Sequence, residues 1–442
     1  RLMKRQRSFS GEQPINKKAK YSSSSESDSG DEIGNHWDQL MGNRWESANL
    51  DNMAKRKVKI NNSFTHYDTP DGHLKINNGD IIANKYTIER KLGEGTFGKV
   101  YQCENLSRNP LFRFSRGIDS DYYYKQVAIK IIRSEKKYRS AAFIEINTIL
   151  LMHQRQPCLK DNCVIILDWF AIGNHICIVF PLYGQSLLSY IEDIKNVPVS
   201  YIRDIAWQIL LGLTRLHKQE LIHTDLKPEN ILFTRPLQTI SGLGNVVPEC
   251  TDIRLIDFGN STFSKSYHSN VIATRHYRPP EVLMNIGWSY PCDIWAVGCI
   301  LLEMYTGQVI FAPRDDYEHL AMIEKVISPI PSKMGRQARF EAKTYFYPNG
   351  YFDYHDADRD TELLDNLKKL RKLKEIVHRE HEDFYQLVIS LLEIDPEARC
   401  TALEALELPF FSRISIYRNQ LRRIFDYPPD RLPSIQISSK GT

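Results

Sequence analysis

The spacing of hydrophobic and polar residues along the chain separates a region of strands from a region of helices. Between residues 85 and 105 (KYTIERKLGEGTFGKVYQCEN), β-branched and apolar residues alternate around a glycine cluster, which predicts strand, turn and strand. The apolar run 126–133 (QVAIKIIR) predicts a third strand, and 141–153 (AAFIEINTILLMH) has the apolar spacing of a helix. These elements predict a small, β-rich lobe.

Beyond residue 184 the pattern becomes helical. In the stretch 199–219 apolar residues recur at intervals of three and four, which predicts a long helix with one buried face. Further helical patterns cover 293–306, 318–328, 361–378, 382–393 and 402–407. The polar stretch 235–251 reads as a surface insertion. The expected fold class is α+β with two lobes, in a domain at 80–412: a small β-rich N-lobe at about 80–183 and a larger, mostly helical C-lobe at about 184–412.

Composition narrows the class of protein. The chain has 442 residues, 42% of them hydrophobic, which is enough to bury a large core. Its apolar runs, such as 163–167 and 176–180, are too short to span a bilayer, so no membrane partner is expected. The eight cysteines show no C-x-x-C pair, which favours free thiols in a reducing compartment. The net charge is only +4, which does not indicate binding to nucleic acid, so no nucleic-acid partner is expected.

The termini differ from the rest. Residues 1–79 are expected to be a disordered tail, basic at first and then serine-rich and acidic, because such a stretch cannot bury enough apolar surface. Two basic clusters, Lys4-Arg5 and Lys17-Lys18-Ala19-Lys20, have the spacing of a two-part nuclear import signal. A merely solvated basic tail is the alternative, and RNA binding by this tail is a third reading. Residues 413–442 form a C-terminal tail without an assigned role.

A glycine-rich turn is the first candidate for chemistry. LGEGTFGKV (92–100) lies between two predicted strands, whereas the dinucleotide fingerprint needs a strand followed by a helix. A turn of this kind can lie over a triphosphate, with Gly93, Gly95 and Gly98 letting backbone N–H groups approach the phosphate oxygens. Lys130 follows within an apolar strand, and a buried lysine needs a charged partner. Glu145 on the following helix is the candidate.

The second lobe supplies carboxylates and an amide. The apolar strand in IRLIDFGN (253–260) ends in Asp257, and LIHTDLKPENIL (221–232) contains Asn230, so two oxygen ligands suited to Mg²⁺ are expected. Asp225 in the same stretch can then orient the attacking hydroxyl group and accept its proton. Lys227 can neutralise the transferring phosphoryl group.

These motifs, in this order, resemble the eukaryotic protein kinases over roughly residues 86–412. GEGTFGKV, VAIK, a helix glutamate, HTDLKPEN, DFG and PPE (279–281) carry the resemblance. EHLAMIEKVISPIP (318–331) is similar to the EHLAMMER signature of the LAMMER, or Clk-like, kinases, with differences at Ile323 and Lys325. ATRHYRPPEVL (273–283) and GWSYPCDIWAVGCI (287–300) also look like that family.

The resemblance implies a two-lobed fold that binds ATP and Mg²⁺. It implies transfer of the γ-phosphoryl group to serine and threonine of arginine/serine-rich splicing factors, tyrosine autophosphorylation, and a location in the nucleus, with the cytoplasm as a further place. The alternative is a pseudokinase scaffold that binds partners without catalysis. We expect a monomer. The residues implied to contact ATP are Leu92, Gly93, Glu94, Gly95, Thr96, Phe97, Gly98, Lys99, Val100, Ala128, Lys130, Phe180, Pro181, Tyr183 and Leu232.

Thr224 departs from the commonest kinase pattern. Most kinases have an arginine before the catalytic aspartate, and that arginine pairs with a phosphorylated activation loop. Thr224 cannot make that pair, so the sequence predicts activity without an upstream activating kinase. The segment 260–280 still contains hydroxyl groups that autophosphorylation could use: Ser261, Thr262, Ser264, Ser266, Tyr267, Ser269, Thr274 and Tyr277.

Overall fold

The structure is a computed structural model, and it describes residues 68–107, 125–239, 246–248, 251–266, 268–354 and 361–412. All of these belong to one compact unit. The predicted nuclear import signal, most of the predicted N-terminal tail, the connection at 108–124 and the C-terminal tail lie outside the described residues. The described structure begins at Asp68 rather than at Asp80, because a short turn at 68–74 is bonded to the sheet.

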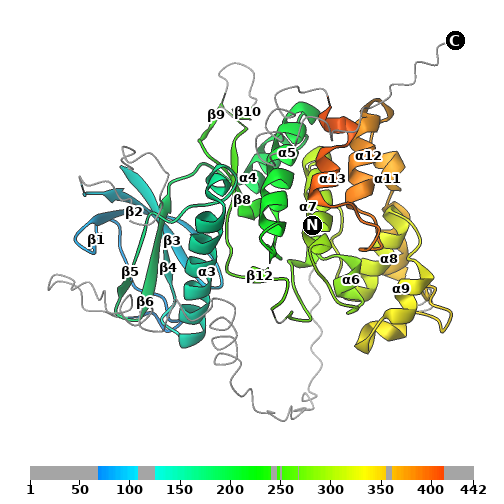
Figure 1. The fold of residues 1–442 in the computed structure, drawn as a ribbon, viewed down its shortest axis with the longest axis horizontal. Helices are drawn as coiled ribbons and strands as arrows, with labels where there is room; N and C mark the ends of the chain where they lie inside the picture. The colour runs from blue at the N-terminus through cyan, green and yellow to red at the C-terminus, as the bar shows by residue number, and fades with distance from the viewer. Residues whose placement is uncertain are drawn as a thin grey trace, which may run out of the picture. The chain divides into compact units, whose positions relative to one another are not determined.

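The first lobe is built on a six-stranded antiparallel sheet in the order β1-β2-β3-β4-β6-β5 (Figure 1). Its strands are β1 (Ile81–Ile82), β2 (Tyr86–Glu94), β3 (Gly98–Asn105), β4 (Gln126–Ile132), β5 (Asp168–Ile172) and β6 (His175–Pro181). The alternation of apolar residues therefore predicted β2 and β3 correctly, and the apolar run at 126–133 predicted β4. Buried and half-exposed residues alternate along β4, as expected for a strand with two different faces.

Helix α3 (Lys136–Arg155) packs on this sheet against β4 and β6. Its buried apolar residues Ala142, Ile146, Ile149 and Met152 recur at intervals of three and four, so they form one stripe toward the core. Burial of each of the three larger side chains, Ile146, Ile149 and Met152, contributes about 1.5–3 kcal/mol to the stability of the fold. The helix is longer than the predicted 141–153. Glu145 lies on the same buried face.

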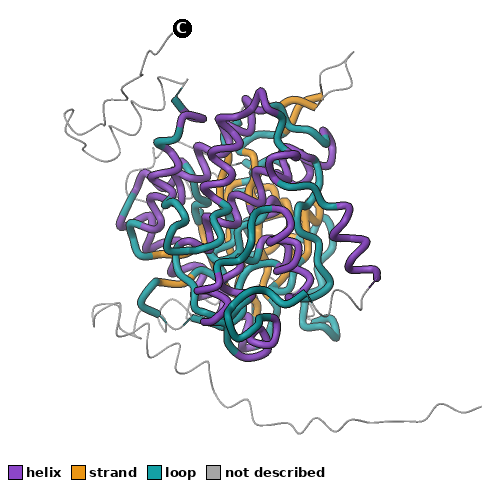
Figure 2. Tube along the Cα trace, turned by 90° about the vertical axis from the view of Figure 1, so that its right-hand side faces the viewer, coloured by secondary structure: helices purple, strands orange, loops and turns teal. Residues whose placement is uncertain are grey.

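The second lobe is mostly helical, as predicted, and Figure 2 shows its helices in front of the strands. The two central helices are α5 (Val199–His217) and α7 (Pro291–Thr306), which pack on each other. In α7 a Cβ at Gly298 would come within 2.6 Å of the side chain of Leu392, at the end of α12 (Glu382–Leu391), so glycine is needed for close packing of α7 on α12. The remaining helices are α4 (Leu187–Ile194), α6 (Pro280–Leu283), α8 (Asp316–Val326), α9 (Ser332–Gln337), α10 (Thr361–Lys369), α11 (Leu373–Ile376) and α13 (Ala402–Leu406).

Two predicted elements differ from the structure. The helix predicted at 361–378 is divided into α10 and α11, because Lys372 is extended and its backbone N–H bonds to the Glu375 carboxylate at 3.3 Å. The stretch predicted as an insertion at 235–251 contains a strand pair, β9 (Leu237–Thr239) and β10 (Val246–Pro248). Apolar periodicity indicates burial but does not show where a capping residue interrupts a helix.

Two further short strand pairs complete the described part of the second lobe. β8 (Ile231–Phe233) pairs with β11 (Ile253–Leu255), and β7 (Leu221–Ile222) pairs with β12 (Thr262–Phe263). No helix in the described part of the chain is long and apolar enough to cross a membrane. The cysteines that the structure describes are all free.

Candidate active site

The glycine-rich turn joins β2 and β3, as the sequence predicted. The turn is closed by a hydrogen bond from Gly95 N to Gly98 O at 2.9 Å. At Gly93 and Gly95 a Cβ would meet nothing within 4 Å, so this backbone faces open space. At Gly98 a Cβ would lie 2.2 Å from the Ile131 carbonyl oxygen. Gly98 is therefore required by the close approach of strands β3 and β4, which the motif alone did not show.

Lys130 on β4 is paired with two carboxylates. Its Nζ donates to Glu145 Oε1 and Oε2 at 2.9 and 2.8 Å, and to Asp257 Oδ1 at 3.1 Å. Burial disfavours the charged ammonium group, but the two carboxylates outweigh burial and raise the pKa of Lys130. The partner predicted for Lys130 is thus the partner found. The contact with Asp257 joins the two lobes.

Asp257 follows β11 in a left-handed backbone conformation, with φ of +62°. The charge of Lys130 holds the pKa of Asp257 below its ordinary value, against the opposing effect of burial. The next residue, Phe258, is fully buried, with its ring centroid 5.0 Å from that of His223. Burying the phenylalanine fixes the carboxylate that precedes it, which offsets the cost of the backbone conformation.

The loop around Asp225 is held by the buried carboxylate of Asp293, at the start of α7. Asp293 accepts backbone N–H bonds from His223 and Thr224, both at 2.9 Å, and a bond from His217 Nε2 at 2.9 Å. Burial alone would raise the pKa of Asp293, but these bonds and the neighbouring histidines lower it. Thr224 has φ of +69° and donates its hydroxyl to the Asn260 carbonyl at 2.8 Å. This anchoring places Asp225 beside Lys227.

Both oxygens of Asp225 are engaged by the protein. Lys227 Nζ donates to Oδ2 at 3.0 Å. Thr274 donates to Oδ1 through its backbone N–H at 3.1 Å and through its hydroxyl at 2.8 Å. Lys227 also donates to the Thr274 hydroxyl oxygen at 2.9 Å. Thr274 is therefore a positioning residue for the aspartate and the lysine, and sequence spacing did not reveal it.

Asn230 and Asp257 have the donor set expected for Mg²⁺. The Asn230 side-chain N–H donates to the Asp225 carbonyl at 2.9 Å, which leaves its amide oxygen as the group that can bind a cation. The backbone N–H of Ile256 donates to the Asn230 carbonyl at 2.9 Å, so the pairing of β8 with β11 holds the two side chains near each other. Asp257 Oδ2 is not used by Lys130. An amide oxygen and a carboxylate oxygen suit a hard cation that shares its shell with phosphates.

The residues predicted to contact ATP come from both lobes. Strand pairing sets Val100 opposite Lys130 and Ala128 opposite Phe180. Leu232 lies on β8 in the second lobe and is bridged to Ser186. The other predicted residues lie on β2 and β3 or the turn between them, or at and just after the end of β6: Leu92, Glu94, Thr96, Phe97, Lys99, Pro181 and Tyr183. Their contacts with ATP stay predictions.

Several hydroxyl groups predicted as available for autophosphorylation are occupied. Ser261 is buried and donates to the His223 carbonyl at 3.3 Å. Tyr277 is buried with its hydroxyl 2.7 Å from Glu303, and burial together with that carboxylate raises its pKa. Thr274 is bonded to Asp225. Tyr267 lies outside the described residues.

The signature stretch EHLAMIEK lies on α8 and is mostly core. Glu318 accepts the backbone and side-chain N–H groups of Arg314 at 2.8 and 2.9 Å. Burial lowers the pKa of His319 to about 3, so its imidazole is neutral. Residues buried along this helix are Tyr317, Glu318, His319, Leu320, Ala321, Met322, Ile323 and Val326. Most residues of this signature therefore serve to pack α8 into the core of the second lobe.

Comparison with known proteins agrees with this geometry. Residues 86–411 match the protein kinase domain family. The chain is 38% identical over 357 residues to dual specificity protein kinase CLK2 of Homo sapiens, covering 78% of this chain and 68% of that protein. It is 38% identical to serine/threonine-protein kinase Doa of Drosophila melanogaster, covering 78% of this chain and 41% of Doa.

A plant relative and a solved structure extend the match. Serine/threonine-protein kinase AFC3 of Arabidopsis thaliana is 36% identical, with 84% of this chain and 95% of that protein covered. A crystal structure of a kinase domain superposes with a TM-score of 0.68 at 32% identity, covering 77% of this chain and 99% of that chain. The paired Lys130, the anchored Asp225 and these matches show that the chain belongs to the LAMMER, or Clk-like, dual-specificity family of protein kinases.

Proposed function

We propose that this kinase uses Mg-ATP to phosphorylate serine and threonine in arginine/serine-rich splicing factors, and that it also autophosphorylates on tyrosine. The observation that supports transfer most directly is the placement of Asp225, with both of its oxygens oriented by Lys227 and Thr274. An aspartate held in this way can orient a substrate hydroxyl group and accept its proton.

The other residues of the site have separate roles in this proposal. Lys130, oriented by Glu145, would hold the phosphates of ATP, and the Gly93–Gly98 turn would lie over them. Asn230 and Asp257 would hold Mg²⁺, which when bound neutralises phosphate charge and orients the transferred group. Lys227 would stabilise charge on the transferring phosphoryl group.

Carboxylates beside the catalytic loop support a substrate rich in arginine. Glu229 is exposed and immediately precedes Asn230. Burial chiefly raises the pKa of Glu303, and the negative charges of Glu229 and Glu192 add to the effect. Glu303 is buried and bonded to Tyr277, so the exposed Glu229 is the carboxylate to which a guanidinium group could donate charge-assisted hydrogen bonds. The names of the relatives describe kinases and do not identify their substrates.

The test compares intact protein with Asp225→Asn and Glu229→Gln in phosphate transfer from Mg-ATP to an arginine/serine repeat peptide. Asp225→Asn should lower kcat by about a hundredfold or more, since it removes the proton acceptor. Glu229→Gln should raise KM for the repeat peptide about tenfold, as expected for losing one charged hydrogen bond.

A repeat-free acidic peptide is the control substrate, and its KM should not rise in Glu229→Gln. Equal, negligible transfer by intact protein and Asp225→Asn would contradict catalysis and favour the pseudokinase scaffold. Efficient transfer to the acidic peptide would contradict the proposed substrate class.

Nuclear localisation belongs to the same proposal. It depends on the two basic clusters, Lys4-Arg5 and Lys17-Lys18-Ala19-Lys20. Replacing the lysines of the second cluster by glutamine in a fluorescently tagged chain should reduce its nuclear fraction. An unchanged distribution would contradict an import role for these residues.

A further inference from the structure

A short turn at 68–74 precedes the region that matches the kinase family. Its ends meet in a bridge between Asp68 and Leu74. Inside it, Thr69 N donates to His73 O at 2.8 Å, and His73 N donates to Thr69 Oγ1 at 3.1 Å. Gly72 has φ of +77°, a conformation that favours glycine. The turn is therefore a defined structure, although the family match begins only at residue 86.

Two contacts attach this turn to the sheet. The Gly72 carbonyl accepts the backbone N–H of Ser134, at 2.9 Å, just beyond β4. Asp68 Oδ1 lies 3.0 Å from Nε2 of His175 on β6. His175 is buried, and its Nδ1 lies 2.7 Å from the Ile132 carbonyl. The turn is thus held at both ends against the part of the sheet that leads into α3.

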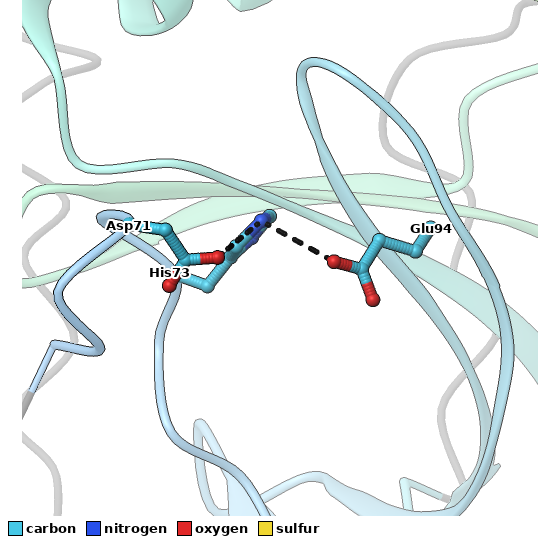
Figure 3. A group of neighbouring side chains, drawn as sticks. All are labelled: Asp71, His73 and Glu94. Atoms are coloured by element: carbon cyan, nitrogen blue, oxygen red, sulfur yellow. Dashed lines mark ion pairs between the residues drawn. The ribbon is translucent and has the colours of Figure 1, made fainter. Parts of the chain in front are cut away.

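His73 is buried in the middle of the turn and accepts a hydrogen bond from Arg133. Arg133 Nε lies 3.0 Å from His73 Nε2. Asp71 and Glu94 approach the same nitrogen from its two sides at 3.5 and 3.7 Å (Figure 3), which is beyond hydrogen-bond length. One lone pair accepts one bond, so Nε2 is the acceptor of the guanidinium N–H and the imidazole is neutral.

A metal ion does not fit this cluster as it stands. Asp71, His73 and Glu94 could in principle offer one ligand atom each. However, the His73 lone pair is already bonded to Arg133, and Lys99 lies 3.8 Å from Glu94. Burial chiefly lowers the pKa of His73, and the charges of Lys99 and Arg133 lower it further, against Asp71 and Glu94. Two fixed cations would repel a third, so the cluster reads as a structural contact.

Arg133 connects His73 to the phosphate side of the active site. Its backbone N–H donates to the carbonyl of Phe97, in the glycine-rich turn, at 3.0 Å. Its guanidinium carbon lies 5.4 Å from the ring centroid of Tyr138 on α3. The Tyr138 and Phe97 rings meet edge to face at 6.0 Å, and Lys130 Nζ lies 5.9 Å from the Phe97 ring centroid. A series of contacts therefore links His73 to Lys130 through Arg133, Tyr138 and Phe97.

We infer that His73 is a positioning residue for ATP: by orienting Arg133 it fixes Phe97, the glycine-rich turn and the start of α3, and so the site of Lys130. The inference rests on the proposed use of Mg-ATP. Without the imidazole acceptor, the Arg133 guanidinium loses its partner inside the turn and must reorient toward solvent. The glycine-rich turn is then held less firmly, so the affinity for ATP falls. Binding of the protein substrate is unaffected.

The experiment uses the full chain and three variants. His73→Phe keeps an aromatic ring but removes the acceptor, and it should raise KM for ATP about tenfold, as for loss of one bond to a charged group. His73→Gln offers an amide oxygen to Arg133 and should restore KM to within about threefold of the unmodified chain. Asp71→Asn, on the same turn but exposed, is the matched control and should change KM by less than about twofold. KM for the peptide should not change.

Other outcomes would overturn the inference. One is a KM for ATP in His73→Phe that equals that of the unmodified chain. Another is an equal rise in both KM values with a lower melting temperature, which would indicate general loosening of the fold. If His73→Phe does not fold, Arg133→Met removes the donor of the same bond and should raise KM for ATP by a similar factor. An inactive unmodified chain would instead contradict the proposed function.

Discussion

Two buried ion pairs lie at the two ends of the segment 257–281. At its start, Asp257 shares Lys130 with Glu145. At its end, Glu281 is bound by both terminal nitrogens of Arg399 at 2.7 and 2.9 Å. The residues of the first pair are among those that the sequence analysis placed in the active site, whereas Glu281 and Arg399 are not. The geometry gives physical reasons for that division.

The two pairs differ in net charge and in how completely they are satisfied. The side chains of Arg399 and Glu281 are fully buried, and Arg399 also donates to the carbonyls of Glu393, Pro291 and Ile394. That pair therefore has no net charge and is shielded from solvent. Lys130 faces two carboxylates, and Asp257 keeps 28% of its side chain exposed. A site with surplus negative charge and an exposed oxygen can take up a cation, whereas a closed neutral pair can only stabilise the fold.

The largest expected effect comes from a change at Lys130 that conserves charge. Lys130→Arg keeps a cation beside Glu145, so the fold should remain, but the planar guanidinium cannot place its nitrogens where the ammonium lies. Activity should fall about a hundredfold, as expected for misplacement of a catalytic group by about 1 Å. Initial rates and thermal unfolding of the same preparation measure both quantities. Activity within tenfold of the unmodified chain would remove the distinction between the two pairs.

The second expected effect is on stability and concerns Arg399. Arg399→Met leaves Glu281 buried and unpaired, which should lower the free energy of unfolding by about 3–5 kcal/mol. Urea unfolding measures this change. The double variant Glu281→Leu, Arg399→Met should recover much of the loss, because no buried charge then remains without a partner. A double variant less stable than the single one would show that the pair contributes more than mutual neutralisation.

A smaller effect is expected in the pH dependence of stability. The pKa of Asp257 is lowered chiefly by Lys130, so this carboxylate stabilises the fold fully above the unfolded-state pKa of about 3.9. That contribution is lost as the pH falls through the lower, folded-state value. Melting temperatures of the unmodified chain and Asp257→Asn should therefore keep a constant difference from pH 7 to about pH 5, and converge only below about pH 4. Convergence between pH 5 and 7 would contradict the assigned direction.

The smallest expected effect is that of removing phosphate from the segment between the two pairs. Protein groups hold this segment: the Thr224 hydroxyl bonds to Asn260, and the His268 ring stacks on Trp288 at 4.2 Å. Trp288 Nε1 also donates to the Ser269 carbonyl at 2.8 Å. Because none of these contacts needs a phosphate, phosphatase treatment should lower activity by less than about threefold. A loss of nearly all activity would show that phosphate supports the segment after all.

Some parts of the fold followed from local sequence alone. Alternation predicted β2 and β3, an apolar run predicted β4, and intervals of three and four predicted α5, because these patterns depend on neighbours a few residues apart. The chemical groups followed as well, since Asp225 and Asn230 lie within one short stretch. The division into α10 and α11 did not follow from the sequence. The apolar periodicity continues through Lys372, although its extended backbone separates the two helices.

The sequence by itself determined which chemical groups are expected in the candidate active site, and the tertiary structure decided which of them meet and which others join them. Asp257 reaches Lys130 across 127 positions, and Thr274 reaches Asp225 across 49. His73 reaches Arg133 across 60 positions, from a turn that precedes the family match. Such contacts depend on strand pairing and helix packing between distant segments, so the spacing of residues along the chain does not predict them.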